Sequence, residues 1–530
     1  MPTLDWIGKD KVINHHNDVP YKVLERKYSY DEDGEHKDDI RSENMIIHGD
    51  NLEALKSLLP QYEGKIKCIY IDPPYNTGNE GWIYNDNVND PKIKKWLGEV
   101  VGKEGEDLSR HDKWLCMMYP RLVLLKKLLH PTQGVIFISI DENEFANLKL
   151  MCNEIFNISN FVISIAWQKR YSRENRGAIG DSHEYILIYA TNPDVFKETR
   201  NYLPLTEKQL KAYSNPDNDP RGLWQSVSLL AQGYRPNQMY EIVAPNGKVH
   251  LPPEGNCWKV VQSEYERALA EGRVTFGSDG NGVPRRKQFL NESKGLVPWS
   301  WWPFDEVGHT DEAKKEMKAI LGNITAFDTP KPVRLIERIV HIATKKDSVI
   351  LDSFAGSGTT AHAVLNMNKK DGGNRKFILV EMGDYADTIT AERVKRVIDG
   401  YGEGKNAVDG TGGNFSYYEL GSPLFLKDGT INNDIDTAEI RKYIWYTETN
   451  GLEYAENEQE KYYLGSHNDT AYYFYYEKDK ATILDYSFLA TVNVKNQAYI
   501  IYADSCTLSD IDLQKWNITF KKIPRDIEHI

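Results

Sequence analysis

A strand, a glycine-rich turn and a helix follow one another in residues 348–365, and this order constrains the fold more than any other part of the chain. The strand-like run 348–351 precedes the turn, and the run 361–365 is a plausible helix start. Glycines at such a turn let the backbone approach a ligand closely at the carboxyl end of the strand. The pattern is typical of the nucleotide-binding start of a doubly wound α/β sheet, with an ordinary strand-to-helix turn as the alternative.

A second strand supports the nucleotide-type interpretation. Residues 376–381 are strand-like and end in Glu381, and an acid in this position binds ribose hydroxyls in other nucleotide folds. The turn before it contains Gly356-Ser357-Gly358, but no Gly-Lys-Ser/Thr follows, which excludes a Walker A loop. The full three-glycine dinucleotide fingerprint is also absent from the sequence. The order of strand, turn, helix and acid therefore predicts a cofactor site of a different kind.

An acid, two prolines and an aromatic residue, Asp72-Pro73-Pro74-Tyr75, close the apolar run 68–71. The run predicts a buried strand, and the prolines stiffen its tip because each fixes its own φ and restricts the residue before it. A carboxylate and carbonyl oxygens at the tip can accept hydrogen bonds from an amino group, while the tyrosine ring can stack on a flat ring. We interpret the tip as a site for a planar base with an exocyclic amine, with a turn after a strand as the alternative.

Together the two motifs resemble those of the amino-group DNA methyltransferases that use S-adenosylmethionine. The tip 72–75 is similar to the catalytic motif of that family, and the turn 354–358 to its cofactor motif. The catalytic motif comes first, which is the permuted order of the beta class. Within that class the chain most resembles the modification subunit of type III restriction–modification systems, and this closer resemblance rests on the stretches 48–55, 72–78, 301–316 and 327–332.

The resemblance covers about residues 40 to 400 and implies a fold class. We expect an α/β protein with a Rossmann-like methyltransferase sheet in the permuted motif order, an inserted target-recognition domain and a small mixed C-terminal domain. A structural insertion without a recognition role is the alternative for the loop-rich middle. The expected boundaries are 1–43 for an irregular N-terminal arm, 44–199 for the catalytic half, 200–325 for the insertion, 326–400 for the cofactor half, 401–415 for a linker and 416–530 for the C-terminal domain.

Short apolar strands alternate with amphipathic helices on both sides of the insertion, which implies a mostly parallel sheet with helices on both faces. The expected strands are 44–47, 67–71, 134–140, 185–189, 348–351 and 376–381. The expected helices are 52–59, 114–129, 142–155, 333–343 and 388–398.

The exocyclic amine of adenine is a poor nucleophile, because its lone pair is delocalised into the ring. Acceptors held on the amine hydrogens localise that lone pair and stabilise the positive charge that develops. We assign this role to the Asp72 side chain and the Pro73 carbonyl, with Asp72 or water taking the proton. The base must be flipped out of the duplex, and Tyr75, after the rigid Pro74, would stack on it. Asn76 contacts the base or fixes the loop, and the sequence does not separate these roles.

The resemblance also implies cofactor contacts. The turn 352–358 holds the methionine part of the cofactor and Glu381 the ribose. Asp50 contacts the cofactor adenine, caps the helix after it, or does both. Thr329 and Lys331 flank the methionine part, although a helix N-terminus beside a proline gives the same pattern. The full set of expected cofactor-binding residues is Asp50, Thr329, Lys331, Asp352, Phe354, Ala355, Gly356, Ser357, Gly358 and Glu381.

Charge is the main argument against DNA binding, since the formal net charge is -13. Binding depends on local patches, however, and two basic clusters stand out. Arginine contacts phosphates or guanine edges, but a solvated charged loop gives the same pattern. The expected DNA-binding residues are Asn76, Lys169, Arg170, Arg173, Arg176, Arg285 and Arg286.

Composition bears on metal binding, on the cellular compartment and on membrane insertion. The 530 residues include five scattered cysteines without a Cys-x-x-Cys pair, and the histidines lack metal-site spacing, so we expect no metal and a reducing cytoplasm. No apolar run approaches the roughly 20 residues of a membrane span, and no signal peptide is expected.

The expected function is adenine-N6 methylation of double-stranded DNA. By resemblance the chain is a homodimer that works with a separate restriction subunit carrying helicase and nuclease activity. Cytosine-N4 methylation uses the same geometry, although in the resembled family an acid at the first position of the motif favours adenine. A solitary methyltransferase, a recognition module that delivers a nuclease, and RNA methylation remain alternatives.

Overall fold

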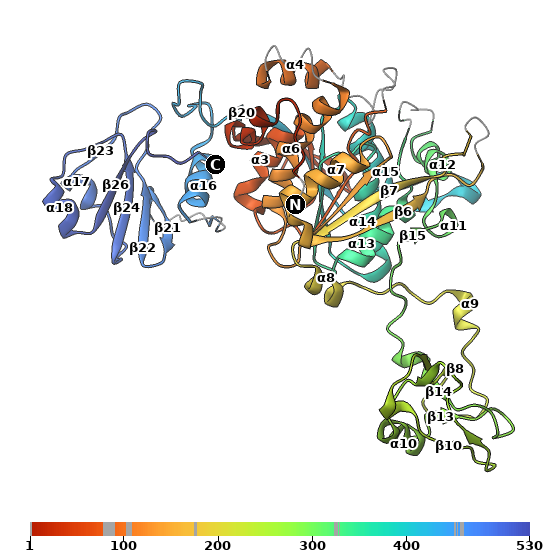
Figure 1. Cartoon of the computed structure of the whole chain (residues 1–530). Helices are drawn as coiled ribbons and strands as arrows, with labels where there is room; N and C mark the ends of the chain where they lie inside the picture. The colour runs from red at the N-terminus through yellow and green to blue at the C-terminus, as the bar shows by residue number, and fades with distance from the viewer. Residues whose placement is uncertain are drawn as a thin grey trace. The chain divides into compact units, whose positions relative to one another are not determined.

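The computed structural model describes residues 3–77, 91–101, 109–173, 178–322, 327, 329–449, 452, 454–455 and 460–529, with the backbone alone at 91–94 and 96. These residues form two compact units, residues 1–201 with 299–530 and the insertion 202–298. Each unit is described by itself below (Figure 1).

An eleven-stranded sheet is the centre of the larger unit. In spatial order its strands are β15 (Trp301–Trp302), β6 (Phe161–Gln168), β7 (His183–Ala190), β5 (Val135–Ile140), β4 (Cys68–Ile71), β16 (Val349–Asp352), β17 (Lys376–Glu381), β3 (Met45–His48), β20 (Phe415–Pro423), β1 (Lys22–Asp31) and β2 (Gly34–His36).

The strands from β5 to β20 are parallel to one another, whereas β7 is antiparallel to β5. The chain runs from β4 outward to β5 on one side, and from β16 outward to β17 on the other side. The strand order therefore reverses between β4 and β16. Open α/β sheets bind ligands at such a switch point, outside the carboxyl ends of the strands.

Helices cover the parallel strands, which are buried on both faces. Ile69 and Ile71 point to one face and pack in a core with α3 (Asn51–Tyr62), α6 (Arg110–Leu128) and α7 (Phe145–Cys152). Cys68 and Tyr70 point to the other face and are equally buried. There α14 (Thr359–Asp371) contacts β17, α13 (Val333–Ala343) and α15 (Glu392–Asp399). The predicted α/β class is thus confirmed (Figure 1).

The insertion has its own sheets and core. A three-stranded sheet contains β13 (Val274–Thr275), β14 (Arg285–Phe289) and β8 (Trp224–Ser228), and helix α10 (Gln262–Ala270) contributes Tyr265 to a small apolar cluster around Trp258. Two smaller pairs are β10 (Ile242–Val243) with β11 (Val249–His250), and β9 (Leu230–Gln232) with β12 (Asn256–Trp258).

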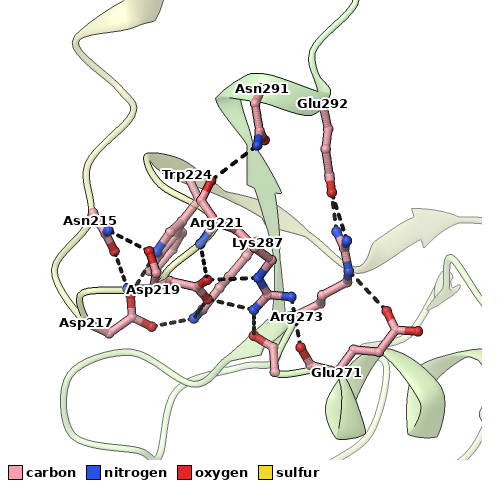
Figure 2. Close-up of polar contacts among 11 residues, drawn as sticks. Asn215, Asp217, Asp219, Arg221, Trp224, Glu271, Arg273, Lys287, Asn291 and Glu292 are labelled. Atoms are coloured by element: carbon pink, nitrogen blue, oxygen red, sulfur yellow. Dashed lines mark hydrogen bonds and ion pairs between the residues drawn. The ribbon is translucent and has the colours of Figure 1, made fainter.

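Polar contacts fasten the loop before β8 to β14 (Figure 2). The Lys287 ammonium lies 3.1 Å from an Asp219 carboxylate oxygen and also binds Asp217. The Arg221 guanidinium lies 2.6 Å from the same Asp219 carboxylate. The guanidinium groups of Arg221 and Arg273 also lie over the ring of the fully buried Phe289. A small unit with little apolar core is therefore held together by ion pairs and cation–π contacts.

The C-terminal residues form a second sheet, with β21 (Tyr463–His467), β22 (Thr470–Phe474), β24 (Ala498–Ala503) and β26 (Ile518–Lys522). Tyrosines fill the cores on both faces of this sheet, as in the pair Tyr472 and Tyr473. The helices here are α16 (Thr437–Thr449), α17 (Tyr486–Leu489) and α18 (Asp510–Lys515), and β23 (Ile483–Leu484) pairs with β25 (Ser505–Cys506).

The remaining α-helices and β-strands are four to twelve and two residues long, respectively. They are α1 (Lys9–Val12), α2 (His15–Asp18), α4 (Pro91–Val100), α8 (Pro193–Thr199), α9 (Glu207–Leu210), α11 (Phe304–Val307), α12 (Thr310–Leu321), β18 (Gly400–Tyr401) and β19 (Val408–Asp409). None of the helices in the described ranges is both long and apolar enough to cross a bilayer.

The ends of the main sheet correct two expectations. The irregular arm expected at 1–43 contains β1, which pairs with β20 over its length, and that partner strand takes in the last residue of the expected linker and the start of the C-terminal domain expected at 416–530. Residues 299–322, expected in the insertion, belong to the larger unit, where β15 pairs with β6. Long-range strand pairing produces these differences, and local sequence patterns do not report it.

Candidate active site

Asp72 stands at the end of β4 and is bound by a lysine from far along the chain. The Asp72 side chain is 8% exposed, and the Lys331 Nζ donates hydrogen bonds to both of its carboxylate oxygens, at 2.7 and 2.6 Å. Lys331 immediately precedes Pro332 and α13, and its own side chain is 9% exposed. A carboxylate with so little solvent needs such a counter-ion to stay ionised.

The rest of the tip is held by its neighbours. The Trp114 indole N–H donates to the Pro74 carbonyl at 2.6 Å, so one carbonyl of the tip has a structural partner. The Tyr75 hydroxyl donates to the Glu184 carboxylate on β7 at 3.0 Å, and the Lys331 ammonium lies 5.0 Å from the centre of the Tyr75 ring. These contacts fix the direction of the aromatic ring beside Asp72.

Asn76 ends the tip in a left-handed conformation, with φ of 59°. Its side-chain amide donates to the Arg110 carbonyl at 3.2 Å and to the fully buried carboxylate of Glu144. The His111 Nδ1 lies 2.6 Å from the same carboxylate. The sequence left two roles open for Asn76, contacting the base or fixing the loop. These contacts favour the second role.

Burial and charge compete at this tip. Burial raises the pKa of Asp72, and the Lys331 ammonium opposes that rise. Burial would lower the pKa of Lys331, but the Asp72 and Glu184 carboxylates outweigh it and the pKa is raised. Burial together with the Asp72 and Glu184 charges holds the pKa of Tyr75 well above its usual range. The tip therefore has an ionised lysine and a neutral tyrosine around one carboxylate.

The glycine turn after β16 wraps around a buried acid. The Phe354 N–H and the Thr360 hydroxyl donate to Asp352 at 3.1 and 2.5 Å. Burial raises the pKa of Asp352 to about 7, despite these two donors. Gly356 and Gly358 have φ of 53° and 77°, and a side chain at Gly358 would place Cβ 3.0 Å from the Thr390 carbonyl oxygen. Glycine is thus required by both conformation and space.

Glu381 closes the turn from the neighbouring strand. One carboxylate oxygen accepts the Gly356 N–H at 2.7 Å, and the other accepts the Gly383 N–H and the Tyr385 hydroxyl at 2.7 and 2.9 Å. The carboxylate thus ties the glycine turn after β16 to the end of β17. The Ser353 Oγ is buried and makes no hydrogen bond within the described part of the chain.

The two predicted motifs meet in one cavity of about 20 Å³ between the ends of β4 and β16. Its lining residues are Tyr70, Asp72, Phe327, Thr329, Pro330, Lys331, Asp352, Phe354, Ala355, Gly356, Ser357, Thr359 and Thr360. A second cavity of about 700 Å³ opens at the carboxyl ends of β3 and β17, where Asp50 and Met382 line it. The switch point of the sheet therefore brings together residues that lie more than 250 positions apart.

Comparison with known proteins agrees with this arrangement. Residues 66–392 match the protein family described as DNA methylase. The chain belongs to that family. The matched residues contain both motifs and the inserted unit between them.

Several known proteins resemble the chain over most of its length. It is 36% identical over 430 residues to the type III restriction-modification enzyme StyLTI Mod subunit of Salmonella typhimurium, a match that covers 74% of this chain and 62% of that protein. It is 34% identical to the EcoPI Mod subunit of Escherichia phage P1, with 72% and 63% covered. The type II methyltransferase M.KpnI of Klebsiella pneumoniae is 31% identical, with 64% and 80% covered. The chain thus spans less than two thirds of the type III subunits that it matches.

Asp50 has a structural role that fits one of its two predicted interpretations. Its carboxylate accepts the Leu52 and Glu53 N–H groups at 2.9 and 3.3 Å, so it caps α3. Its other oxygen lies 3.3 Å from the buried Arg121 guanidinium. Because Asp50 also lines the larger cavity, the cap leaves its predicted cofactor contact possible.

The predicted DNA-binding residues of this DNA methylase lie in different surroundings. Lys169 is largely buried and pairs with Asp181 and Glu184 at 2.9 and 3.3 Å, whereas Arg170 and Arg173 are exposed. Arg176 lies outside the described residues. In the insertion, Arg285 and Arg286 are exposed on β14.

Three residues of the site, two of them buried and one partly buried, escaped sequence reasoning. Glu184 touches the tip from β7, and Glu144 holds it from the start of α7. Arg393 is fully buried and donates to the Ser357 and Thr359 hydroxyls at 2.9 and 2.8 Å. Each belongs to an ordinary amphipathic segment, so only the tertiary fold distinguishes it from a surface charge.

Proposed function

We propose that this DNA methylase transfers a methyl group from S-adenosylmethionine to the N6 amine of adenine in duplex DNA. One observation carries the proposal: Asp72, the first residue of the tip, and the glycine turn after β16 line the same cavity at the switch point of the sheet. An acceptor for an amine and a backbone cradle for a nucleoside-type cofactor are thereby placed next to each other.

The residues at this edge fit S-adenosylmethionine. The turn offers backbone that a side chain would obstruct, Glu381 offers acceptors for ribose hydroxyls, and the Ser353 hydroxyl is buried without a partner among the described residues. The larger cavity beside Asp50 and Met382 has room for the adenosine part. When bound, the cofactor supplies a methyl group on a positively charged sulfur.

The chain's own residues prepare the amine. The Asp72 carboxylate and the Pro73 carbonyl accept the amine hydrogens, which localises the nitrogen lone pair and stabilises the charge that develops. Asp72 or water then takes the proton. Tyr75 stacks on the base once it has left the duplex, since a paired base lies too deep in the helix to reach Asp72.

We further propose that the chain is the modification subunit of a type III restriction–modification system. Its similarity to the StyLTI and EcoPI Mod subunits supports this assignment. The inserted unit would read the target sequence, with Arg285 and Arg286 on its exposed strand. A homodimer and a separate restriction subunit complete the proposal. Size measurement with and without DNA tests the dimer, and a monomer in both conditions would contradict it.

Methylation mapping tests the reaction. The protein is incubated with genomic DNA and labelled S-adenosylmethionine, and modified bases are located by single-molecule sequencing. We expect N6-methyladenine in one short sequence motif. Detection of N4-methylcytosine instead would show that the target base is cytosine. An absence of any modification by folded, cofactor-binding protein would overturn the proposal.

A further inference from the structure

Four ionisable side chains form one buried cluster around the catalytic tip. Asp72 and Tyr75 come from the end of β4, Glu184 from β7, and Lys331 from the segment before α13. The Lys331 ammonium contacts both Asp72 oxygens and lies 3.9 Å from Glu184. Glu184 accepts the Tyr75 hydroxyl at 3.0 Å and lies 3.3 Å from the ammonium of Lys169.

Negatively and positively charged side chains alternate along this cluster. Lys331 lies between two carboxylates, one that the reaction uses and one that it does not. Glu184 in turn lies between Lys331 and Lys169, so no buried carboxylate of the cluster is left without a cation. A buried ion pair adds little to stability, but removing one partner leaves a charge that is costly to keep. The arrangement therefore acts mainly on the ionisation and direction of Asp72.

We propose that Lys331 and Glu184 are positioning residues of the methyl-transfer site: Lys331 keeps the Asp72 carboxylate ionised and oriented, and Glu184 fixes the Tyr75 ring and limits how strongly Lys331 acts on Asp72. This inference rests on the proposed function. It gives Lys331 a role toward the target amine in addition to the cofactor contact expected for it, and it gives Glu184 a role that no sequence motif indicated.

Geometry explains how Lys331 can orient Asp72. The Lys331 ammonium lies between the two carboxylate oxygens and donates a hydrogen bond to each of them. The two contacts together fix the direction of the carboxylate at the end of β4, in the way that a supporting residue orients a reactive group.

The charges facing Asp72 give the two positioning residues opposite effects. Besides Lys331 and Glu184, the groups that face Asp72 are Tyr70 and Tyr75, both neutral, and Asp352. Removing the Lys331 charge leaves burial unopposed and raises the pKa of Asp72. Removing the Glu184 charge takes away a repulsive neighbour and lowers that pKa.

The pH dependence of methyl transfer tests the inference. Single-turnover rates are measured with saturating DNA and cofactor between about pH 5 and pH 9 for the wild type, Lys331→Met, Lys331→Arg and Glu184→Gln. Because Asp72 must be ionised, the rate is full above its pKa and is lost as the pH falls through it. We expect Lys331→Met to shift this acid limb, the fall of the rate at low pH, to a pH that is higher by about one unit or more. At low pH its rate is then about tenfold lower than that of the wild type.

The other two variants supply the controls. Lys331→Arg should return the limb toward that of the wild type, because the positive charge is restored. Glu184→Gln keeps an acceptor for the Tyr75 hydroxyl and should move the limb downward. The inference would be overturned if the acid limbs of the pH–rate profiles coincided in all four proteins. It would also be overturned if the limbs of Lys331→Met and Glu184→Gln moved in the same direction.

A stability measurement separates this inference from the proposed function. Lys331→Met leaves the buried Asp72 charge alone and should lower the thermal midpoint at pH 8, and adding Asp72→Asn should recover most of the loss. Additive losses in the double variant would contradict the coupling. If the wild type transfers no methyl group, the proposed function fails, while this cycle still decides whether the two charges act on each other.

Discussion

At the scale of single residues, two acids end adjacent parallel strands in different surroundings. Lys331 binds the Asp72 carboxylate directly, whereas the hydrogen-bond donors to Asp352 among the described residues are uncharged, the Thr360 hydroxyl and the Phe354 N–H. The Lys331 ammonium opposes the rise that burial causes in the pKa of Asp72, whereas burial raises the pKa of Asp352 to about 7 despite its two donors. The difference follows from contacts between residues far apart in the sequence, which local sequence patterns do not show.

Asp352 should make the protein's stability depend on pH. Its pKa in the folded chain is raised from 3.8 to about 7, so the folded state holds this proton more tightly than the unfolded state. Its contribution is then complete below about pH 3.8 and is lost as the pH rises through about 7. Asp352→Asn should raise the free energy of unfolding at pH 8 by roughly 1–3 kcal/mol. Urea denaturation at pH 5 and pH 8 measures the difference, and a larger gain at pH 5 would contradict it.

Tyr75 should act through its ring more than through its hydroxyl. Stacking of a base on an aromatic side chain contributes roughly 1–3 kcal/mol, so Tyr75→Ala should weaken capture of the flipped base about 10- to 100-fold. Tyr75→Phe keeps the ring and loses the hydroxyl that donates to Glu184. Fluorescence of an adenine analogue at the target position reports flipping. Equal losses in the two variants would assign the effect to the hydroxyl instead.

At the scale of elements, the sequence predicted the parallel strands well because each is a short apolar run. The expected strands at 44–47, 67–71, 134–140 and 376–381 match β3, β4, β5 and β17 within one residue at either end. The helix expected at 333–343 coincides with α13. Runs buried on both faces carry their own signal, since most of the residues in them are apolar.

The sequence did not predict the outer strands, and the reason is physical. Half of the ten residues of β1 are charged and the strand is only partly buried, so its local pattern resembles an irregular charged segment. It becomes a strand through pairing with β20, where the Ser29 and Ser416 hydroxyls lie 2.8 Å apart across 387 positions of sequence. β6 also escaped prediction. It lies beside the two-residue edge strand β15, and most of its residues are only partly buried.

Gly358 tests the link between the glycine turn and the helix after it. It precedes α14 in a left-handed conformation, and an added Cβ would meet the Thr390 carbonyl. Gly358→Ala should cost roughly 1–2 kcal/mol of stability and weaken binding of S-adenosylmethionine. Gly372, which ends the same helix in open space, is the matched control: its alanine variant carries a similar backbone strain without a neighbour to displace. Equal cofactor affinity in the two variants would contradict the role of the turn.

At the scale of the whole molecule, the two compact units contain different parts of the proposed function. The larger unit contains the cavity where both motifs meet, while the insertion has a core and a polar network of its own. The sequence predicted an insertion from its loop-rich composition but extended it to residue 325, because the short strand β15 and helix α12 look like the loops beside them. The net charge of -13 is likewise a property of the whole chain that hides the exposed arginines of β14.

Removing the insertion should separate these functions. A chain in which residues 202–298 are replaced by a short glycine–serine linker should fold and bind S-adenosylmethionine, because the β-bridge between Leu203 and Leu296 already brings the ends of the insertion together. Calorimetry of cofactor binding and a DNA mobility assay measure the two properties. We expect cofactor affinity within about threefold of the full chain and at least a tenfold loss of DNA affinity. Unchanged DNA affinity would place recognition outside the insertion.

The central claim is that Asp72 acts on an adenine amine, and nucleoside analysis tests it most directly. DNA without prior methylation is treated with the protein and S-adenosylmethionine, digested to nucleosides and analysed by mass spectrometry, with Asp72→Ala as the matched control. The account predicts N6-methyldeoxyadenosine from the wild type and none from the variant. N6-methyldeoxyadenosine in equal amounts from both proteins would contradict it, because the amine would then be activated without the carboxylate at the end of β4.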